Sequence, residues 1–146
     1  MSARRDTQRL GRMLRVRSLQ LDLARAEQAA AADRASSATA LAARIEALRQ
    51  DVAPREGSDQ GLSLFAAAHY RDRLARSGLE AQRRVQLTHQ QLDQARDAAT
   101  AAKRDHGVVE KLIERELQAK ARAALKALED APQTARTLAR SLLKDG

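Results

Sequence analysis

Apolar residues recur at helical spacing along most of this chain, and polar residues fill the positions between them. The stretch VVEKLIEREL, residues 108–117, places Val109, Leu112, Ile113 and Leu117 on one side of a helix. This pattern predicts a helix that buries one narrow stripe and leaves its other faces in water. No stretch alternates apolar and polar residues as a half-buried strand would, so we expect an all-α fold.

One stretch interrupts the helical pattern, DVAPREGSDQG at residues 51–61. Pro54 has no amide donor and disfavours a helical backbone at Ala53, while Gly57 and Gly61 add flexibility. We therefore predict a helix over residues 5–51, a turn over 52–61 and a second, longer helix over 62–131. The tail, residues 132–146, begins at a proline and is expected to form a last short helix or to fray. All of these segments belong to a single domain, residues 1–146.

The second helix carries an apolar stripe at alternating steps of four and three residues, the heptad spacing of a coiled coil. Nine of these twelve positions are apolar. They are Leu74, Gly78, Ala81, Val85, Thr88, Leu92, Ala95, Ala99, Ala102, His106, Val109 and Ile113. A long helix with so narrow a stripe needs a partner, and the short turn makes the first helix the nearest one. We therefore predict a long antiparallel two-helix coiled-coil hairpin.

The first helix has a matching stripe near its end, formed by Ala38, Leu41, Ile45, Leu48 and Val52. Toward its start the stripe is less regular. It runs through Leu10, Met13, Leu14, Leu21 and Ala24, with Arg17 and Gln28 interrupting. The antiparallel arrangement is expected to place Leu48 and Val52 opposite Leu74, and Val109 and Ile113 opposite residues 10–21.

The composition limits the size of the core and the range of chemistry. Alanine supplies most of the apolar residues and buries little area, and there is no cysteine or tryptophan. No apolar run approaches the ~20 residues that a membrane span needs, so we expect a soluble, cytosolic protein. No glycine-rich phosphate loop or nucleophile motif is present, and no two histidines have an i, i+4 spacing. His106 is interpreted as a packed residue of the stripe, and we expect no enzymatic activity, cofactor, metal or small-molecule substrate.

Basic residues outnumber acidic ones, 27 to 19, which gives a formal net charge of +8. Six arginines and one acid, Asp6, lie among the first seventeen residues. The hairpin would bring this segment near the basic C-terminal tail. The candidate binding residues are Arg5, Arg9, Arg12, Arg15 and Arg136. This basic pole is either a solvated face or a docking site for an acidic protein ring or nucleic acid. Single-strand binding is disfavoured because the pole has no aromatic residues.

The only two aromatic residues, Phe65 and Tyr70, lie just after the predicted turn. They are five residues apart and cannot share one narrow stripe, so at least one should be exposed. With Leu74 they form a second candidate binding surface. The alternative is that both close the end of the hairpin against Leu62 and Val52.

Two segments resemble the FliJ family of flagellar type III export proteins. LGRMLRVRSLQLDLARAEQA resembles the basic amphipathic start of that family, and LDQARDAATAAKRDHGVVEKLIERE resembles its C-terminal half. Chain length, one turn near a third of the chain and the longer second helix also agree.

The resemblance implies a coiled coil similar to the central shaft of rotary ATPases, without catalysis of its own. Its terminal end would enter the hexameric export ATPase, and the region nearer the turn would contact the export gate membrane protein and export chaperones. The expected location is cytoplasmic, at the inner face of the cell membrane through these partners. A basic coiled-coil nucleic-acid binder and a scaffold completed by dimerisation remain alternatives, and the oligomeric state stays open.

Overall fold

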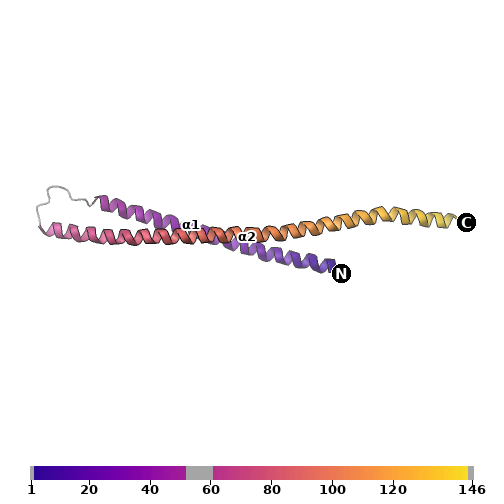
Figure 1. Cartoon of the computed structure of the whole chain (residues 1–146), viewed down its shortest axis with the longest axis horizontal. Coiled ribbons are helices and arrows are strands. Elements are labelled where there is room, and N and C mark those ends of the chain that lie inside the picture. Colours follow the sequence, from indigo (N-terminus) through magenta and orange to yellow (C-terminus); the bar gives the residue numbers. More distant parts are fainter. Residues whose placement is uncertain (1, 52–60, 145–146) are drawn as a thin grey trace. The chain divides into compact units, whose positions relative to one another are not determined.

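Both described parts of the chain are helical. The computed structural model describes the backbone of residues 2–51 and 61–144, and the side chains of these residues other than 61–63 and 132–136. Helix α1 spans Ser2–Asp51 and helix α2 spans Gly61–Lys144 (Figure 1). No strand occurs within these ranges. The all-α prediction is confirmed for this part of the chain.

The end of α1 agrees with the prediction, whereas the end of α2 differs from it. Helix α1 ends at Asp51, three residues before the proline that was expected to stop it. Residues 52–60 of the predicted turn lie outside the described residues, whereas Gly61, its last predicted residue, begins α2. Helix α2 continues through Pro132 to Lys144, so the end predicted near residue 131 is wrong. A proline inside a helix removes one backbone hydrogen bond, and here the flanking residues keep the helical conformation.

The chain divides into two compact units, and each contains a piece of both helices. One unit is Gln20–Ala102, which we call the neutral unit because it holds eleven basic and eleven acidic residues. The other combines Met1–Leu19 with Lys103–Gly146, and we call it the basic unit. It holds sixteen basic and eight acidic residues, so the whole net charge of +8 belongs to it.

Small side chains allow α1 and α2 to pack closely in the neutral unit. Ala31 and Ala35 of α1 form a buried cluster with Leu92 and Ala95 of α2. At Gly78 of α2, an added Cβ would lie 3.7 Å from the Cγ2 methyl of Ile45 on α1. Alanine and glycine bring two helix backbones together but bury little apolar area for each residue.

Polar side chains join the two helices in the basic unit. The Lys120 amino group donates to the Thr7 hydroxyl over 2.7 Å, and Arg17 pairs with Asp105 at 3.3 Å. The earlier residue of α1, Thr7, pairs with the later residue of α2, Lys120, whereas the later residue of α1, Arg17, pairs with the earlier residue of α2, Asp105. The two helices therefore pack against each other in a way that is compatible with a hairpin.

The apolar stripe predicted on α2 is confirmed, because all twelve of its positions are buried or half-buried. Leu74, Leu92 and Val109 are among the buried residues, with 8%, 8% and 3% of their surface exposed. Thr88 is a polar member of the stripe, and its hydroxyl donates to the backbone carbonyls of Arg84 and Val85 at 2.8 and 3.1 Å. A polar residue is tolerated there because its hydrogen bonds are made within its own helix.

The stripe on α1 follows a different register from the predicted one. Leu41 and Leu48 are each 44% exposed, whereas Ala42 is buried and Ile45 is half-buried. The observed stripe consists of Leu10, Leu14, Arg17, Leu21, Ala24, Gln28, Ala31, Ala35, Ala38, Ala42 and Ile45. Its alternating steps of four and three pass through Arg17 and Gln28 without a break. The prediction favoured the larger leucines over this spacing, so its assignment of Leu41 and Leu48 to the buried stripe is wrong.

Candidate protein-binding surfaces

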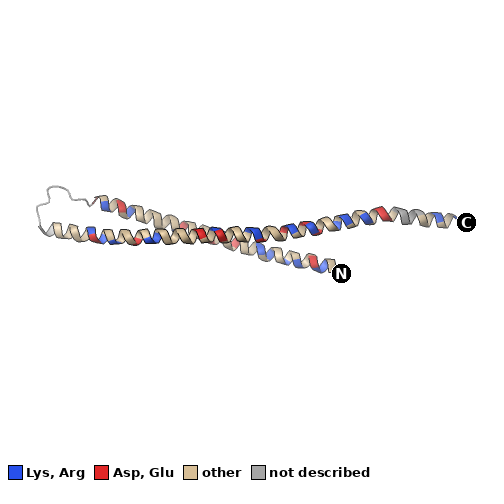
Figure 2. Cartoon of the chain, viewed as in Figure 1, with Lys and Arg blue, Asp and Glu red and all other residues tan. Residues whose placement is uncertain are grey.

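Four predicted binding arginines, Arg5, Arg9, Arg12 and Arg15, lie exposed on α1 within the basic unit. Figure 2 shows in blue the Lys and Arg positions along both helices. At ~100° per residue the four arginines fall within an arc of about 120°. The same geometry puts this arc on the side of α1 opposite the stripe that contacts α2. Among the described residues, none of the four makes an ion pair or a hydrogen bond through its side chain.

This arrangement leaves the four guanidinium groups available to a partner without disturbing the packing of α1 on α2. A guanidinium presents a planar fork of donors that matches a carboxylate or a phosphate. The side chain of Arg136, the fifth predicted residue, lies outside the described residues.

A cluster of polar side chains connects α1 and α2 in the basic unit. The Ser18 hydroxyl lies 3.0 Å from Nε2 of His106, and Nδ1 of His106 lies 2.6 Å from a carboxylate oxygen of Glu110. A carboxylate oxygen only accepts hydrogen bonds, so Nδ1 is the donor of the contact with Glu110. The ion pair of Arg17 with Asp105 is adjacent in sequence to this cluster.

The connectivity of serine, histidine and carboxylate is the same as in the relay that activates a catalytic serine. Acyl transfer also needs amide donors aimed at the developing oxyanion. Ser18 and His106 lie inside continuous helices, where backbone amides already donate to carbonyls four residues earlier. The cluster therefore has the serine–histidine–carboxylate connectivity, but the amides of these helical turns are used within the helices. What its hydrogen bonds do is link α1 to α2.

His106 is half-buried in the stripe, as predicted, but Ser18 and Glu110 were missed. The spacing of Glu110, four residues after His106, places the two on one helix face and was visible in the sequence. Ser18 could be found only from the register between the helices. Among the described residues, no group of three or more histidine, cysteine, aspartate or glutamate side chains could hold a metal ion.

The second predicted surface, on α2 in the neutral unit, does not bring its three residues together. Phe65 is 81% exposed and Tyr70 is 46% exposed, whereas only 8% of Leu74 is exposed. The prediction that at least one aromatic residue is exposed is confirmed. Leu74 belongs to the buried stripe of α2. The side chains of Val52 and Leu62, the proposed closing partners, lie outside the described residues.

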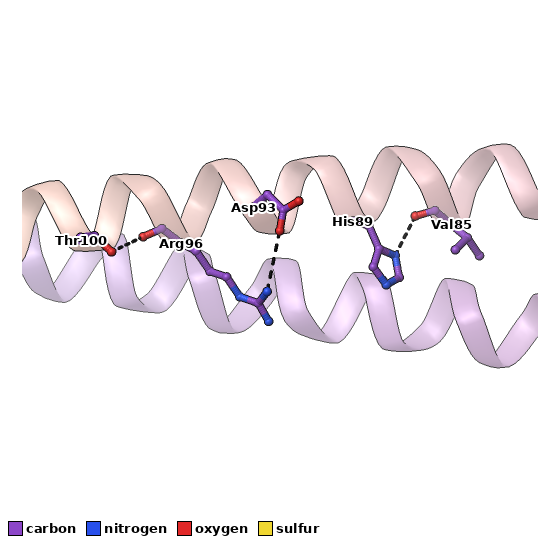
Figure 3. A network of polar contacts seen from close by, with 5 residues as sticks. All are labelled: Val85, His89, Asp93, Arg96 and Thr100. Carbon is purple, nitrogen blue, oxygen red and sulfur yellow. Dashed lines mark hydrogen bonds and ion pairs between the residues drawn. The ribbon is translucent and has the colours of Figure 1, made fainter.

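Three polar contacts within α2 of the neutral unit lie along residues 85–100 (Figure 3). The His89 ring donates from Nδ1 to the Val85 carbonyl at 2.8 Å, and Arg96 pairs with Asp93 at 3.7 Å. The Thr100 hydroxyl donates to the Arg96 carbonyl at 3.0 Å. Each contact spans three or four residues of one helix, and such exposed pairs add only ~0.3–0.5 kcal/mol. The side chains that make these contacts lie on the solvated surface of the helix.

None of the described helices is long and apolar enough to cross a lipid bilayer. No protein-family model, no curated protein and no solved structure matches this chain.

Proposed function

We propose that this protein is a non-catalytic stalk of the flagellar type III export apparatus, which docks by its basic unit into the hexameric export ATPase. The observation that carries the proposal is the confinement of the whole net charge of +8 to one of two helical units. A field of this kind attracts and orients an acidic partner more than it adds to the final affinity. Arg5, Arg9, Arg12 and Arg15 are the proposed contacts, since they are exposed and lie away from the stripe.

The proposed architecture is an antiparallel coiled-coil hairpin with a longer second helix. The order of the pairs Thr7–Lys120 and Ser18–His106, together with heptad spacing on both helices, supports it. A paired helix keeps its shape where a single helix with a narrow stripe would not. Such stiffness suits a shaft that turns or transmits force inside a ring.

The neutral unit would contact the export gate membrane protein or an export chaperone through Phe65 and Tyr70. Their exposure supports this role, because large aromatic side chains are favoured anchors at protein interfaces. Leu74 is left out of this surface, since it is buried against α1. The protein would then act in the cytoplasm, at the inner face of the membrane through its partners.

The test is the hydrolysis rate and hexamer fraction of the cognate export ATPase, measured with and without the purified chain. Reversing three charges, Arg9→Glu, Arg12→Glu and Arg15→Glu, should abolish most of the stimulation at low salt. The loss should shrink as salt is raised, because the screening length falls from ~10 Å at 0.1 M to ~3 Å at 1 M.

The matched control reverses Arg73, Arg83 and Arg84, three exposed arginines of the neutral unit. It changes the net charge by the same amount and should leave stimulation near the wild-type level. Equal losses in the two triple variants would contradict the proposal. A chain without effect on the ATPase that binds duplex DNA at physiological salt through the same arginines would favour the nucleic-acid alternative.

A further inference from the structure

The C-terminal part of α2 carries exposed leucines along one side. Past Lys120, which contacts Thr7 of α1, every described side chain up to Lys144 is exposed. Leu125, Leu128, Leu138, Leu142 and Leu143 expose 61%, 67%, 62%, 76% and 82% of their surface. In most soluble helices such leucines are scattered, so their placement around the helix decides whether they form a surface.

Helix geometry gathers these leucines on one face. Residues eighteen positions apart point in the same direction at ~100° per residue. Leu125 and Leu143 therefore share one angle, and together with Leu128, Leu138 and Leu142 they fall within an arc of about 140°. Leu117, 59% exposed, lies within the same arc and lines a shallow groove with Leu14 and Ile113. We call this arc the leucine face.

Basic residues flank one edge of the leucine face. Arg122 and Arg140 share one angle, and Lys126 and Lys144 share the next, because both pairs are eighteen residues apart. Residues 117–144 contain six basic and two acidic residues. This charge would repel a second copy of the same helix and would attract an anionic surface.

We propose that the leucine face and its basic flank form an interfacial helix that adsorbs to anionic lipid bilayers. The described helices lack the apolar length of a membrane span, but an interfacial helix needs only one apolar face and a cationic polar face. The leucines would enter the boundary between headgroups and acyl chains, while Arg122, Lys126, Arg140 and Lys144 contact lipid phosphates. The arc of about 140° is also wider than the narrow stripe, two positions in every seven, that a single partner helix covers in a coiled coil. The inference does not depend on the proposed ATPase stalk.

The test is flotation of the full chain with phosphatidylcholine vesicles that contain or lack anionic phosphatidylglycerol. Wild-type protein should float with the anionic vesicles and little with the neutral ones. The double variant Leu138→Glu, Leu142→Glu should lower the partition coefficient about tenfold or more, because charged side chains replace apolar ones at the interface. Both positions are exposed, so the helical signal in circular dichroism should stay unchanged.

The matched control is Leu79→Glu, Leu87→Glu, two leucines of the neutral unit that are 63% and 54% exposed. It should float as the wild type does. Three results would overturn the proposal: no wild-type binding to anionic vesicles, equal binding by the Leu138/Leu142 variant, or an equal loss in the control. A wild-type dimer in sedimentation that the Leu138/Leu142 variant converts to monomer would also overturn it, since a second copy would then cover the leucine face.

Discussion

The neutral unit and the basic unit use the same two helices but distribute their residues differently. In the neutral unit, small apolar residues such as Ala31, Ala35 and Ala95 form the contact between helices, and the outer charges balance. In the basic unit, polar pairs such as Ser18 with His106 join the helices, and the outer surface carries the entire net charge. The same heptad pattern can therefore hold two helices together through apolar contacts in one region and present an outer surface of net positive charge in another.

The largest expected effect is in the neutral unit. Leu92→Asp places a carboxylate among Ala31, Ala35 and Ala95, with no cationic partner in that cluster, and should lower the free energy of unfolding by about 3–5 kcal/mol. Leu87→Asp, at a position 54% exposed, is the control and should cost less than ~1 kcal/mol. Urea unfolding followed by circular dichroism measures both. Similar losses would mean that the cluster does not exclude water.

A second substitution tests how closely the helices approach in that unit. Ala95→Leu adds three carbons where 7% of the alanine is exposed, and overpacking should cost about 1–3 kcal/mol. Ala101→Leu, on the exposed side of α2, should be nearly neutral because leucine has almost the helix propensity of alanine. A gain in stability from Ala95→Leu would show that the two helices are separated by more space than the alanine cluster indicates.

A third substitution tests the polar contacts that join the helices in the basic unit. Ser18→Ala removes the hydroxyl that is hydrogen-bonded to Nε2 of His106 and should cost about 1 kcal/mol. Ser141→Ala, which removes a hydroxyl bonded only to the carbonyl of Leu138, is the control and should change stability less. A double-mutant cycle with His106→Leu isolates the interaction between the two side chains. A coupling energy near zero would contradict the role of this cluster in holding the helices together.

The smallest expected effect comes from a glycine of the basic unit. Nothing lies within 4 Å of a Cβ added at Gly107, which is inside α2. Gly107→Ala should therefore raise the free energy of unfolding by about 0.5–1 kcal/mol through helix propensity alone. Gly11→Ala, equally open on α1, should behave in the same way. A destabilised Gly107→Ala protein would indicate that another molecule or segment occupies the space beside it.

Much of the fold could be predicted from the sequence, because the spacing of apolar residues on α2 is regular over twelve positions. The corresponding stripe on α1 was predicted wrongly at Leu41 and Leu48. Alanine is a weak sign of burial, and the prediction therefore placed the larger leucines in the stripe in place of Ala42. The continuation of α2 past Pro132 was missed because a proline is only a probable helix boundary.

The candidate surfaces were predictable to a smaller extent. The exposed arginines and Phe65 followed from composition and spacing. The burial of Leu74 followed from its place in the predicted stripe, which its assignment to the second binding surface overlooked. The cluster of Ser18, His106 and Glu110 joins residues far apart in the chain. Its geometry depends on the axial register between two helices, which a regular heptad repeat leaves undetermined to within whole heptads.

The alanine contacts of the neutral unit also affect how its stability varies with temperature. The heat capacity change of unfolding grows with the apolar area that unfolding exposes. Two helices joined through Ala31, Ala35 and Ala95 expose little new apolar area when they separate. The heat capacity change per residue should then lie below the ~12–15 cal/mol/K of globular domains, which flattens the curve of stability against temperature. The contact that holds this pair of helices is modest in strength, but it would persist with little change from cold to warm conditions.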